Sequence, residues 1–557
     1  MTQRTLRRGA DALIQTLRAA GVARLFTLSG NHIMSVFDAA IDAGIELVHT
    51  RHEASAVHMA DAWSRITGEV GIALVTGGPG HANAVSALYT ALMAEAPIVL
   101  LSGHAPRDQI GRGAFQEMRQ AEMAAPVCKA AWTCARAEDV AADVAKAIRL
   151  ARSGRPGPVH LSLPSDVLEG PAASGVPAAR AFLPEPTLLD ADLAGRLIDR
   201  LARAARPLIL VGPACLTQAG RRRVRALEEA TGIPVIGMES PRGVNDASLG
   251  AFAPLLARVD CLLLVGKRVD FTLQFGSAFP SAIEVHQVDA DIAEIERGRR
   301  TLGERSGIAA QADAGPALQA LTAAARRAPE SAWRREARDA VTHRPTAWES
   351  ATSGVAGRLH PVQMLRPLQA LIDSHPESVL VCDGGEIGQW AMACLHASHR
   401  INNGVAGSIG AGLPYALAAC VARPDAPIVA VMGDGTVGFH IAEFDTAVRH
   451  GLSFVAVIGN DARWNAEYQI QLRDFGADRL IGCELRPTRY DAVAQAFGAH
   501  GECVVDADAL PAALGRALAS GLPACLNVMI EGLPAPRISR QADADGRNAP
   551  GRQAGLV

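Results

Sequence analysis

The 557-residue chain is 49% apolar and 20% charged, with 53 glycines, a formal net charge of -3 and a pI near 6.6. This length predicts two to four separate cores, because single domains are typically about 100 to 150 residues long. The composition excludes a largely disordered protein, and the near-neutral charge provides no basic field for nucleic acid. We therefore expect small molecules, and no nucleic acid, as partners.

The N-terminal segment and the cysteines predict a cytoplasmic location. Residues 1–26 have apolar side chains at helical spacing, but they lack the unbroken apolar segment of a secretory signal. No stretch reaches the roughly 18 apolar residues of a membrane span, so no membrane association is expected. The ten cysteines stand singly, without a CxxC pair or zinc-ligand spacing. We interpret them as reduced thiols.

Short apolar segments alternate with alanine-rich helical segments along the chain, a pattern typical of parallel α/β sheets. Strands are expected in VGIALVTGGPG, PIVLLSG, PVHLSLP, PLILVGP, CLLLVGK, SVLVCDGG, PIVAVMGDG and FVAVIGND. Five of these eight segments end in Gly or Asp. Because ligands of open α/β sheets bind beyond the carboxyl ends of the strands, we expect the functional sites in these turns.

Two composition breaks, at residues 169–187 and 326–346, divide the chain into three α/β units. The final residues are rich in Gly, Ala, Arg and Asp without periodicity, which is typical of a flexible tail. The prediction is three doubly wound parallel-sheet domains, at residues 1–170, 190–330 and 350–536, followed by a tail at residues 537–557.

The strongest local signal runs from Gly433, Asp434 and Gly435 to Asn460 and Asp461. A strand ends at each acidic residue and a helix lies between them, so a β-α-β unit would bring Asp434 and Asp461 to one sheet edge. Hard oxygen ligands at one point suit Mg2+, which commonly bridges to phosphates. Glycines and a helix N-terminus favour a bound diphosphate. The GDG tripeptide alone would indicate only a turn.

This segment resembles the signature of thiamine diphosphate enzymes, GDG followed by an Asn-Asn pair, which acetolactate synthases, pyruvate decarboxylases and benzaldehyde lyase share. The resemblance implies cofactor contacts at Gly433, Asp434, Gly435 and Thr436, and Mg2+ held by Asp434, Asp461 and the backbone carbonyl of Arg463. The second Asn of the usual pair is Asp461 here, which adds a negative charge and removes an N-H2 donor. We expect magnesium dependence to persist.

The N-terminal segment from RHEASA to GPGHAN is similar to the pyrimidine-binding domain of the same superfamily. Glu53 matches its catalytic glutamate, and the resemblance implies a cofactor contact at Gly80, in the matching GPG turn. In this chemistry a buried, partly protonated carboxyl group bonds to N1' of the aminopyrimidine, so that N4' can deprotonate the thiazolium. A lone glutamate at a helix start would otherwise be an ordinary N-terminal charge.

The C-terminal segments VCDGGEIGQW and NGVAGSIGAG extend the resemblance. It implies that Gly385, Glu386 and Ile387 contact the diphosphate end, that Gly407 offers its carbonyl to N4', and that Ile409 supports the bent cofactor. In the family, the catalytic glutamate comes from the partner subunit. The resemblance therefore implies a homodimer or homotetramer with active sites at the subunit interface.

Two turns are expected to face the substrate. Asn31 is expected to contact the cofactor. His32, next to Asn31, and Gln116 occupy the places where benzaldehyde lyase has its active-site histidine and glutamine. A neutral His could relay protons and Gln116 could orient a carbonyl group. The alternative for His32 is a surface or helix-capping residue. For His81, in GPGHAN, a role in the pocket and simple capping remain equally open.

Over roughly residues 5–530 the sequence is most similar to the acetolactate synthase branch, which decarboxylates a 2-oxo acid and transfers the resulting enamine to an acceptor carbonyl. Ile470 stands where that branch has a Trp.

The segment VGKRVDFTLQFG and the absence of a GMxGxH turn argue against bound FAD. The LQFG ending instead resembles 2-hydroxyacyl-CoA lyases, in which the central domain holds a nucleotide, although no basic cluster matches a CoA site. The alternatives are a 2-hydroxyacyl-CoA lyase, a benzaldehyde lyase-type lyase, a 2-oxo acid decarboxylase, and a non-catalytic thiamine-binding homologue.

Overall fold

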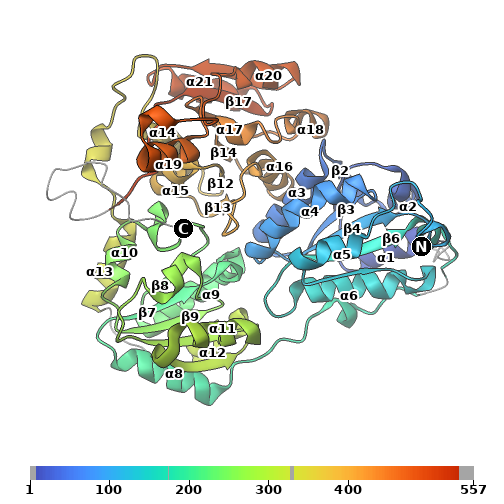
Figure 1. Ribbon diagram of the computed structural model, residues 1–557, viewed down its shortest axis with the longest axis horizontal. Coiled ribbons are helices and arrows are strands. Elements are labelled where there is room, and N and C mark those ends of the chain that lie inside the picture. The colour runs from blue at the N-terminus through green and yellow to red at the C-terminus, as the bar shows by residue number, and fades with distance from the viewer. Residues whose placement is uncertain (1–7, 173–174, 327–330, 539–557) are drawn as a thin grey trace.

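The computed structural model describes residues 8–172, 175–326 and 331–538. It contains three parallel sheets of six, five and six strands. Figure 1 shows them at the right, lower left and top of the molecule, with helices around each. The predicted fold class of three doubly wound parallel sheets is confirmed, and each of the eight predicted strand segments contains a strand.

The first sheet has the order β2-β1-β3-β4-β6-β5. Its strands are β1 (Arg24–Thr27), β2 (Glu46–His49), β3 (Gly71–Val75), β4 (Ile98–His104), β5 (Ala130–Thr133) and β6 (Val159–Pro164). Its helices are α1 (Gly9–Ala19), α2 (Met34–Ala43), α3 (Glu53–Thr67), α4 (Pro79–Met93), α5 (Gln120–Ala124), α6 (Val140–Arg152) and α7 (Ser165–Glu169).

The second sheet has the order β11-β10-β9-β7-β8. Its strands are β7 (Pro207–Val211), β8 (Val235–Gly237), β9 (Cys261–Val265), β10 (Glu284–Asp289) and β11 (Ser306–Gln311). The accompanying helices are α8 (Ala191–Arg203), α9 (Gln218–Thr231), α10 (Phe252–Leu256), α11 (Ile292–Leu302), α12 (Ala314–Ala324) and α13 (Ala332–Thr342).

The third sheet has the order β13-β12-β14-β15-β17-β16. Its strands are β12 (Val379–Cys382), β13 (His399–Asn402), β14 (Ile428–Gly433), β15 (Val455–Asn460), β16 (His500–Val504) and β17 (Ala524–Met529). Its helices are α14 (Pro361–Ser374), α15 (Glu386–Cys394), α16 (Gly412–Ala422), α17 (Asp434–Val437), α18 (Glu443–His450), α19 (Asn465–Phe475), α20 (Tyr490–Ala496) and α21 (Leu510–Ala519).

Alternate residues of the central strands enter different hydrophobic cores. In β3, Ala73 and Val75 lie in one core, whereas Ile72 and Leu74 lie in another. This alternation follows from the period of two along a strand, and it requires helices on both faces of the sheet. The continuously apolar sequences of these strands have the same cause.

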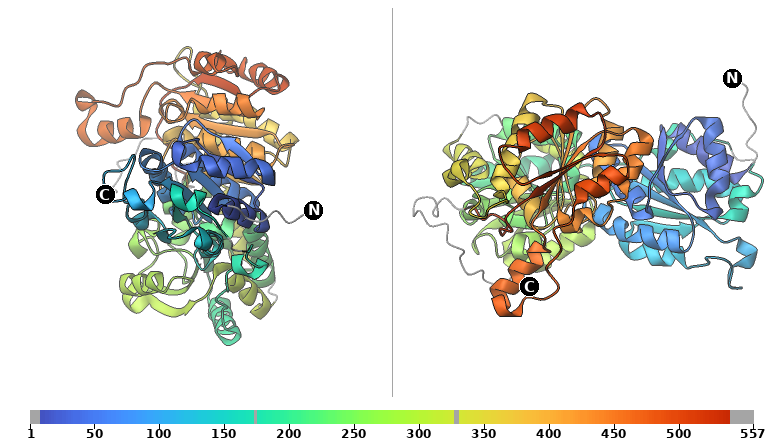
Figure 2. Two further views of the ribbon diagram at one scale, coloured as in Figure 1. Left: turned by 90° about the vertical axis from the view of Figure 1, so that its right-hand side faces the viewer. Right: turned by 90° about the horizontal axis from the view of Figure 1, so that it is seen from above.

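The first and third sheets share one of these cores, through packing of α3 against α16. Helix α16 is apolar on nearly all sides and is buried along most of its length. Tyr415 of α16 donates its hydroxyl to Asp61 of α3 at 2.7 Å, and both side chains are buried. Figure 2 shows the resulting close packing of the blue and orange regions.

Helix α13 lies inside the segment that was predicted as a composition break at residues 326–346. Its apolar residues Trp333, Ala337 and Ala340 recur at helical spacing and pack into a core of the second sheet. The Trp333 indole also donates to the carbonyl of Pro207 at 2.8 Å. The many arginines of this segment lie on the other faces of an amphipathic helix.

The predicted domain boundaries stay predictions. Most of the predicted tail, from residue 539 onward, lies outside the described residues. Within the described ranges, no helix combines the length and apolarity that crossing a lipid bilayer requires.

Candidate active site

The carboxyl edge of the third sheet brings Asp434 and Asp461 together. Strands β12, β14 and β15 are neighbours, and Asp434 and Asp461 directly follow β14 and β15. Their exposed fractions are only 2% and 7%. Burial raises the pKa of both carboxyl groups, and the charge of Asp434 further raises the pKa of Asp461. Two adjacent buried carboxylates favour a cation between them.

The donor atoms at this edge fit Mg2+. Oδ2 of Asp434 is buried without a hydrogen-bond partner. Asp461 Oδ1 accepts the Arg463 N–H at 3.1 Å across Ala462, which has a positive φ of 60°. Among the described residues, no three His, Cys, Asp or Glu side chains form a metal cluster. The carboxylate oxygens of Asp434 and Asp461 are hard donors, the kind that Mg2+ prefers.

Glycines bring two turns into contact at this edge. Ile387 packs against β15, with its Cγ1 2.6 Å from the position of a Cβ at Gly459. The hydroxyl of Thr436 lies 2.8 Å from the position of a Cβ at Gly384, which has φ +106°. The side of Gly435 is covered by the indole of Trp464. The turn at residues 385–387 and the turn at residues 433–436 therefore form one surface.

Asp383, which the sequence argument did not single out, connects this surface to the loop before α16. Its buried carboxylate accepts backbone N–H groups of Gly384 at 2.6 Å, Gly410 at 3.1 Å and Gly412 at 2.6 Å. Burial raises its pKa to about 6. The loop contains the exposed Gly407, with φ +67°, and the half-buried Ile409. Asp383 thus holds Gly407 and Ile409 at a fixed place relative to the turn after β12.

Glu386 has a partner that the sequence did not indicate. Its carboxylate accepts from Arg242 at 3.0 Å, across the boundary between the second and third sheets. Burial raises the pKa of Glu386, and the Arg242 charge opposes this shift. The Arg242 side chain is exposed and lies beside the predicted diphosphate turn.

Arg242 thus places a positive charge beside this turn.

The carboxyl side of the first sheet holds Glu53 as the first residue of α3. Glu53 is 9% exposed, and its Oε2 accepts from the amide of Asn83 at 3.0 Å. Its Oε1 lies 3.2 Å from the position of a Cβ at Gly80. Gly80 therefore leaves open the space in front of this oxygen, and Asn83 is a neighbour that the sequence argument missed.

His32 and Gln116 lie at the edge of the same sheet. His32 is buried in η1 (Asn31–Ile33), with Nδ1 3.2 Å from the hydroxyl of Thr76, and its ring stacks on Phe115. Burial lowers the pKa of His32, which keeps the imidazole neutral near pH 7. The surface alternative for His32 does not hold, although the adjacent Asn31 is exposed. Gln116 has φ +57° and packs against Gly78.

His81 is fully buried. The sequence left open whether this residue lines the pocket or caps a helix. Its Nδ1 lies 2.9 Å from the hydroxyl of Ser102, and its ring centroid is 4.4 Å from that of His160. Helix α4 has Gly78 as its N-cap and no side-chain cap. His81 therefore packs beneath the sheet edge and does not cap the helix.

The two edges are connected at the start of α3. The rings of His52, directly before Glu53, and His440 are 5.6 Å apart. His440 Nδ1 lies 2.7 Å from the carbonyl of Gly410, in the loop that Asp383 holds. The backbone N–H of Arg51 donates to Glu443 at 3.1 Å. A short chain of contacts thus joins the Glu53 segment to the loop with Gly407 and Ile409.

Comparison with known proteins gives matches along most of the chain. Family models match as the N-terminal TPP binding domain (residues 7–123), the central domain (194–321) and the C-terminal TPP binding domain (383–528) of thiamine pyrophosphate enzymes. An acetolactate synthase large subunit of Mycobacterium tuberculosis is 34% identical, over 93% of this chain and 95% of that protein. The 2-hydroxyacyl-CoA lyase 2 of Homo sapiens is 33% identical, over 89% and 85%.

Proposed function

We propose a function from the premise that the chain belongs to the family of thiamine pyrophosphate enzymes. In this proposal the enzyme decarboxylates a 2-oxo acid and joins the remaining fragment to an acceptor carbonyl, the reaction implied by the resemblance to acetolactate synthases. The observation that carries the proposal is the buried pair Asp434 and Asp461 at the edge shared by β12, β14 and β15. This pair suits a Mg2+ ion with a diphosphate bound to it.

The third sheet supplies the anchor for the cofactor. Asp434, Asp461 and the carbonyl of Arg463 would hold Mg2+, and the turns at residues 385–387 and 433–436 would hold the diphosphate. Gly407 and Ile409 would contact the rings. The negative charge that Asp461 adds lies beside the guanidinium of Arg463. This guanidinium lowers the pKa of Asp461, whereas burial raises it. This countercharge supports a magnesium site that tolerates Asp in place of Asn.

The first sheet supplies the proton chemistry. When bound, the thiamine ring system provides the electron sink that lets a bond beside a carbonyl break. Glu53 would hold a proton at Oε1, the oxygen that faces the space left open by Gly80. Asn83 donates to the other oxygen, Oε2, and thereby fixes the orientation of the carboxyl group. A positioned carboxyl group of this kind typically contributes about 10²- to 10⁴-fold to a rate.

The substrate would be oriented by His32 and Gln116. The neutral His32 can donate or accept a proton through Nε2, because Nδ1 faces Thr76. Gln116 carries an amide that can donate to a carbonyl oxygen. Both residues lie on turns of the first sheet, on the side where Glu53 lies. This arrangement supports a small substrate with a carbonyl group.

A second candidate is cleavage of a 2-hydroxyacyl substrate. It is favoured by relatives named 2-hydroxyacyl-CoA lyase 2, whose identity of 33% is nearly that of the acetolactate synthases. Ile470 stands where acetolactate synthases have a Trp, and it is 46% exposed on α19. The chain therefore has no indole ring at that position. Both candidates use the same cofactor residues.

We further propose a homodimer or homotetramer with the active sites at the subunit interface. Phe115 and Phe439, one beside each sheet edge, expose 67% and 54% of their surfaces. Aromatic side chains are enriched at protein–protein interfaces relative to the rest of the surface. A cytoplasmic location is proposed as well, and the ten cysteines, all free of disulfides, support it.

The test is product analysis with purified protein, thiamine diphosphate and Mg2+. Pyruvate and other 2-oxo acids are supplied in one series, and a 2-hydroxyacyl-CoA in another. Release of CO2 together with acetolactate or a homologous 2-hydroxy-2-alkyl acid supports the condensing enzyme. Aldehyde from the thioester, without CO2 from any 2-oxo acid, favours the lyase. If neither series gives product above the level of a Glu53→Gln variant, both candidates are wrong.

A further inference from the structure

The second sheet has a switch point between β7 and β9. The chain runs from β7 outward to β8, and then crosses to β9, β10 and β11 on the other side. Ligands of such sheets bind beyond the carboxyl ends of the strands at the switch point. The family resemblance implies a flavin or a nucleotide in this central part of the chain. The groups at this place decide whether such a ligand fits.

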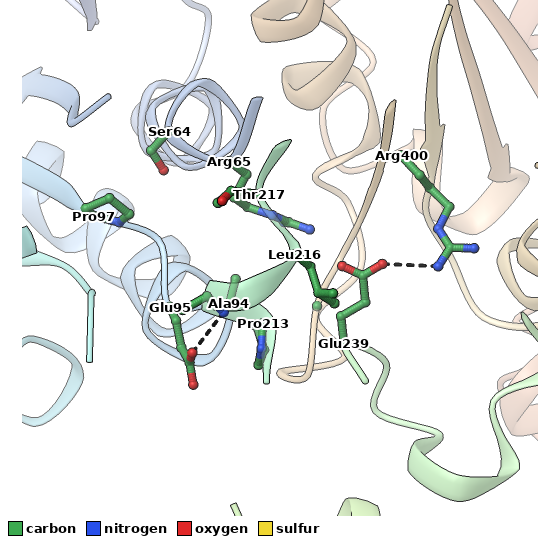
Figure 3. Close-up of a pocket in the computed structure, with 12 residues that line it drawn as sticks. Ser64, Arg65, Ala94, Glu95, Pro97, Pro213, Leu216, Thr217, Glu239 and Arg400 are labelled. Carbon is green, nitrogen blue, oxygen red and sulfur yellow. Dashed lines mark hydrogen bonds and ion pairs between the residues drawn. The ribbon is translucent and has the colours of Figure 1, made fainter. Parts of the chain in front are cut away.

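A carboxylate from the first part of the chain occupies the switch point. Glu95 follows the end of α4, and its Oε2 accepts the backbone N–H of Ala214 at 3.0 Å. Ala214 lies in the first turn of η6 (Pro213–Leu216), just beyond β7. Figure 3 shows this bond as a dashed line beside the cluster of side chains between the three parts. Glu95 thus makes the type of contact that an anionic ligand makes with backbone N–H groups.

Arg155 connects this carboxylate to the other strand ends. It forms ion pairs with Glu95 and with Asp289, the last residue of β10. It also donates to the carbonyl of Gly266, directly after β9, at 3.2 Å. All three charged side chains are nearly inaccessible to solvent. Glu95 and Arg155 together therefore reach the ends of β7, β9 and β10.

Backbone contacts and ion pairs take up part of the space and charge at the switch point, where Glu95, Pro213 and Ala214 line a small pocket (Figure 3). A Cβ at Gly212 would collide with the carbonyl of Gly266, so the turns after β7 and β9 are in direct backbone contact. The buried Lys267 has its own carboxylate partner, Asp270, at 3.6 Å. Deeper between the three parts, Arg400 is likewise paired with Glu239 at 3.1 Å (Figure 3). These two basic groups are thus already paired with carboxylates of the protein.

The backbone of Glu95 indicates that its position is specific. Its φ of +57° lies in the left-handed region, which glycine adopts readily and which is costly for other residues. A glutamate persists in this conformation only where its side chain is strongly held. Here the side chain is only 5% exposed and is held by Arg155 and by the Ala214 N–H.

We infer that Glu95 is an internal anion that occupies the ligand position of the second sheet, so that this chain binds neither a flavin nor a nucleotide there. The side chain lies beside the turn after β7, pairs with Arg155 and connects the first sheet to the second. A flavin or nucleotide does not fit these residues. This inference is independent of the substrate and of the proposed reaction, because its readouts are binding and thermal stability.

The experiment uses the full chain and chemical rescue. Glu95→Ala removes the anion and leaves Arg155 facing a space that a small carboxylate can enter. We expect a lower Tm than in the unchanged protein, and a rise in Tm with sodium formate or acetate that exceeds the rise with sodium chloride at the same ionic strength. The exposed Glu69 provides the control variant Glu69→Ala, which should respond to these salts as the unchanged protein does. Calorimetric titrations of the unchanged protein with FAD and with ADP should show no binding.

Stoichiometric binding of FAD or ADP by the unchanged protein would overturn the inference. It would also be overturned by a Glu95→Ala protein whose Tm responds to formate as the Glu69→Ala control does. If Glu95→Ala does not fold, Glu95→Gln takes its place, because it keeps the shape of the side chain and removes the charge. That variant should unfold at a lower temperature, and an unchanged Tm would contradict the role of the carboxylate.

Discussion

The first and third sheets have the same strand order but present different chemical groups at their carboxyl edges. In both sheets the second strand in the chain is at one edge, followed by the first, third, fourth, sixth and fifth. The third sheet presents the buried carboxylates Asp383, Asp434 and Asp461. The first presents the imidazole of His32 and the amide of Gln116, and Glu53 lies beside them.

The same scaffold can therefore serve two tasks, metal binding and proton transfer, because function resides in the turns and not in the sheet. A cluster of carboxylates in a low-dielectric place attracts a metal ion, whereas a single buried glutamate beside neutral hydrogen-bonding groups is suited to proton transfer. Variants that exchange or remove the groups at one edge should therefore affect one task and leave the other.

The largest effect is expected at the first edge. Glu53→Gln keeps the shape of the side chain and the contact with Asn83, but it removes the ionisable proton. Turnover should fall by about 100-fold or more, the range typical of general acid–base groups. Steady-state kinetics with saturating cofactor measures it, with Glu69→Gln as the matched control. Turnover within a fewfold of the unchanged enzyme would show that Glu53 is not the proton-transferring group.

At the third edge, the expected loss is in cofactor binding. Asp434→Asn removes the charge at the carboxylate whose Oδ2 has no partner in the protein. The affinity for Mg2+ and thiamine diphosphate should weaken by about 10- to 100-fold, a loss seen even for groups behind metal ligands. Asp461→Asn restores the usual amide of the family and should bind the cofactor at least as well as the unchanged chain. Equal losses in both variants would contradict the expectation that an amide oxygen can replace the carboxylate at position 461.

The same pair predicts how stability depends on pH. The pKa values of Asp434 and Asp461 are raised in the folded protein from the usual carboxyl value of 3.8. Between pH 3.8 and these raised values, the folded metal-free protein keeps protons that the unfolded chain has released. This stabilisation is therefore present at low pH and decreases as pH rises through the folded-state pKa values. Mg2+ with thiamine diphosphate should then raise the Tm more at about pH 8 than at about pH 6. Thermal unfolding at both pH values tests this, and an equal shift would contradict it.

The smallest effect is expected at Gln116. Asn tolerates the positive φ of this position, so Gln116→Asn should fold normally while its shorter amide fails to reach the substrate. One lost hydrogen bond of about 1 kcal/mol corresponds to roughly a fivefold loss in kcat/KM. Affinity for the cofactor should not change. A loss of cofactor binding without a change in KM for the substrate would place Gln116 elsewhere in the mechanism.

Much of the architecture could be predicted because central parallel strands are buried on both faces and read as continuous apolar segments. The eight predicted strands are of this kind, and the three family matches confirm the resemblance found in the sequence. Edge strands such as β2 and β13, with the sequences ELVH and HRIN, are only partly buried and carry no comparable signal. Helix α13 was missed because its arginines mask three well-spaced apolar residues.

The site could be predicted only as far as local motifs reach. Asp434 and Asp461 belong to one β-α-β unit, so the spacing indicates their proximity. The contacts of Asp383 with Gly410 and Gly412, and of Arg242 with Glu386, join segments far apart in the chain. No periodicity or spacing encodes such contacts. The pairing of Glu95 with Arg155 was missed for the same reason.

We propose above all that the carboxylates of the third sheet bind the cofactor through a metal ion. Calorimetric titration of thiamine diphosphate into metal-free protein, with and without Mg2+, tests it most directly. We expect saturable binding of one cofactor per chain with Mg2+, and much weaker binding when Mg2+ is omitted. Binding of equal strength without any divalent ion would contradict the claim.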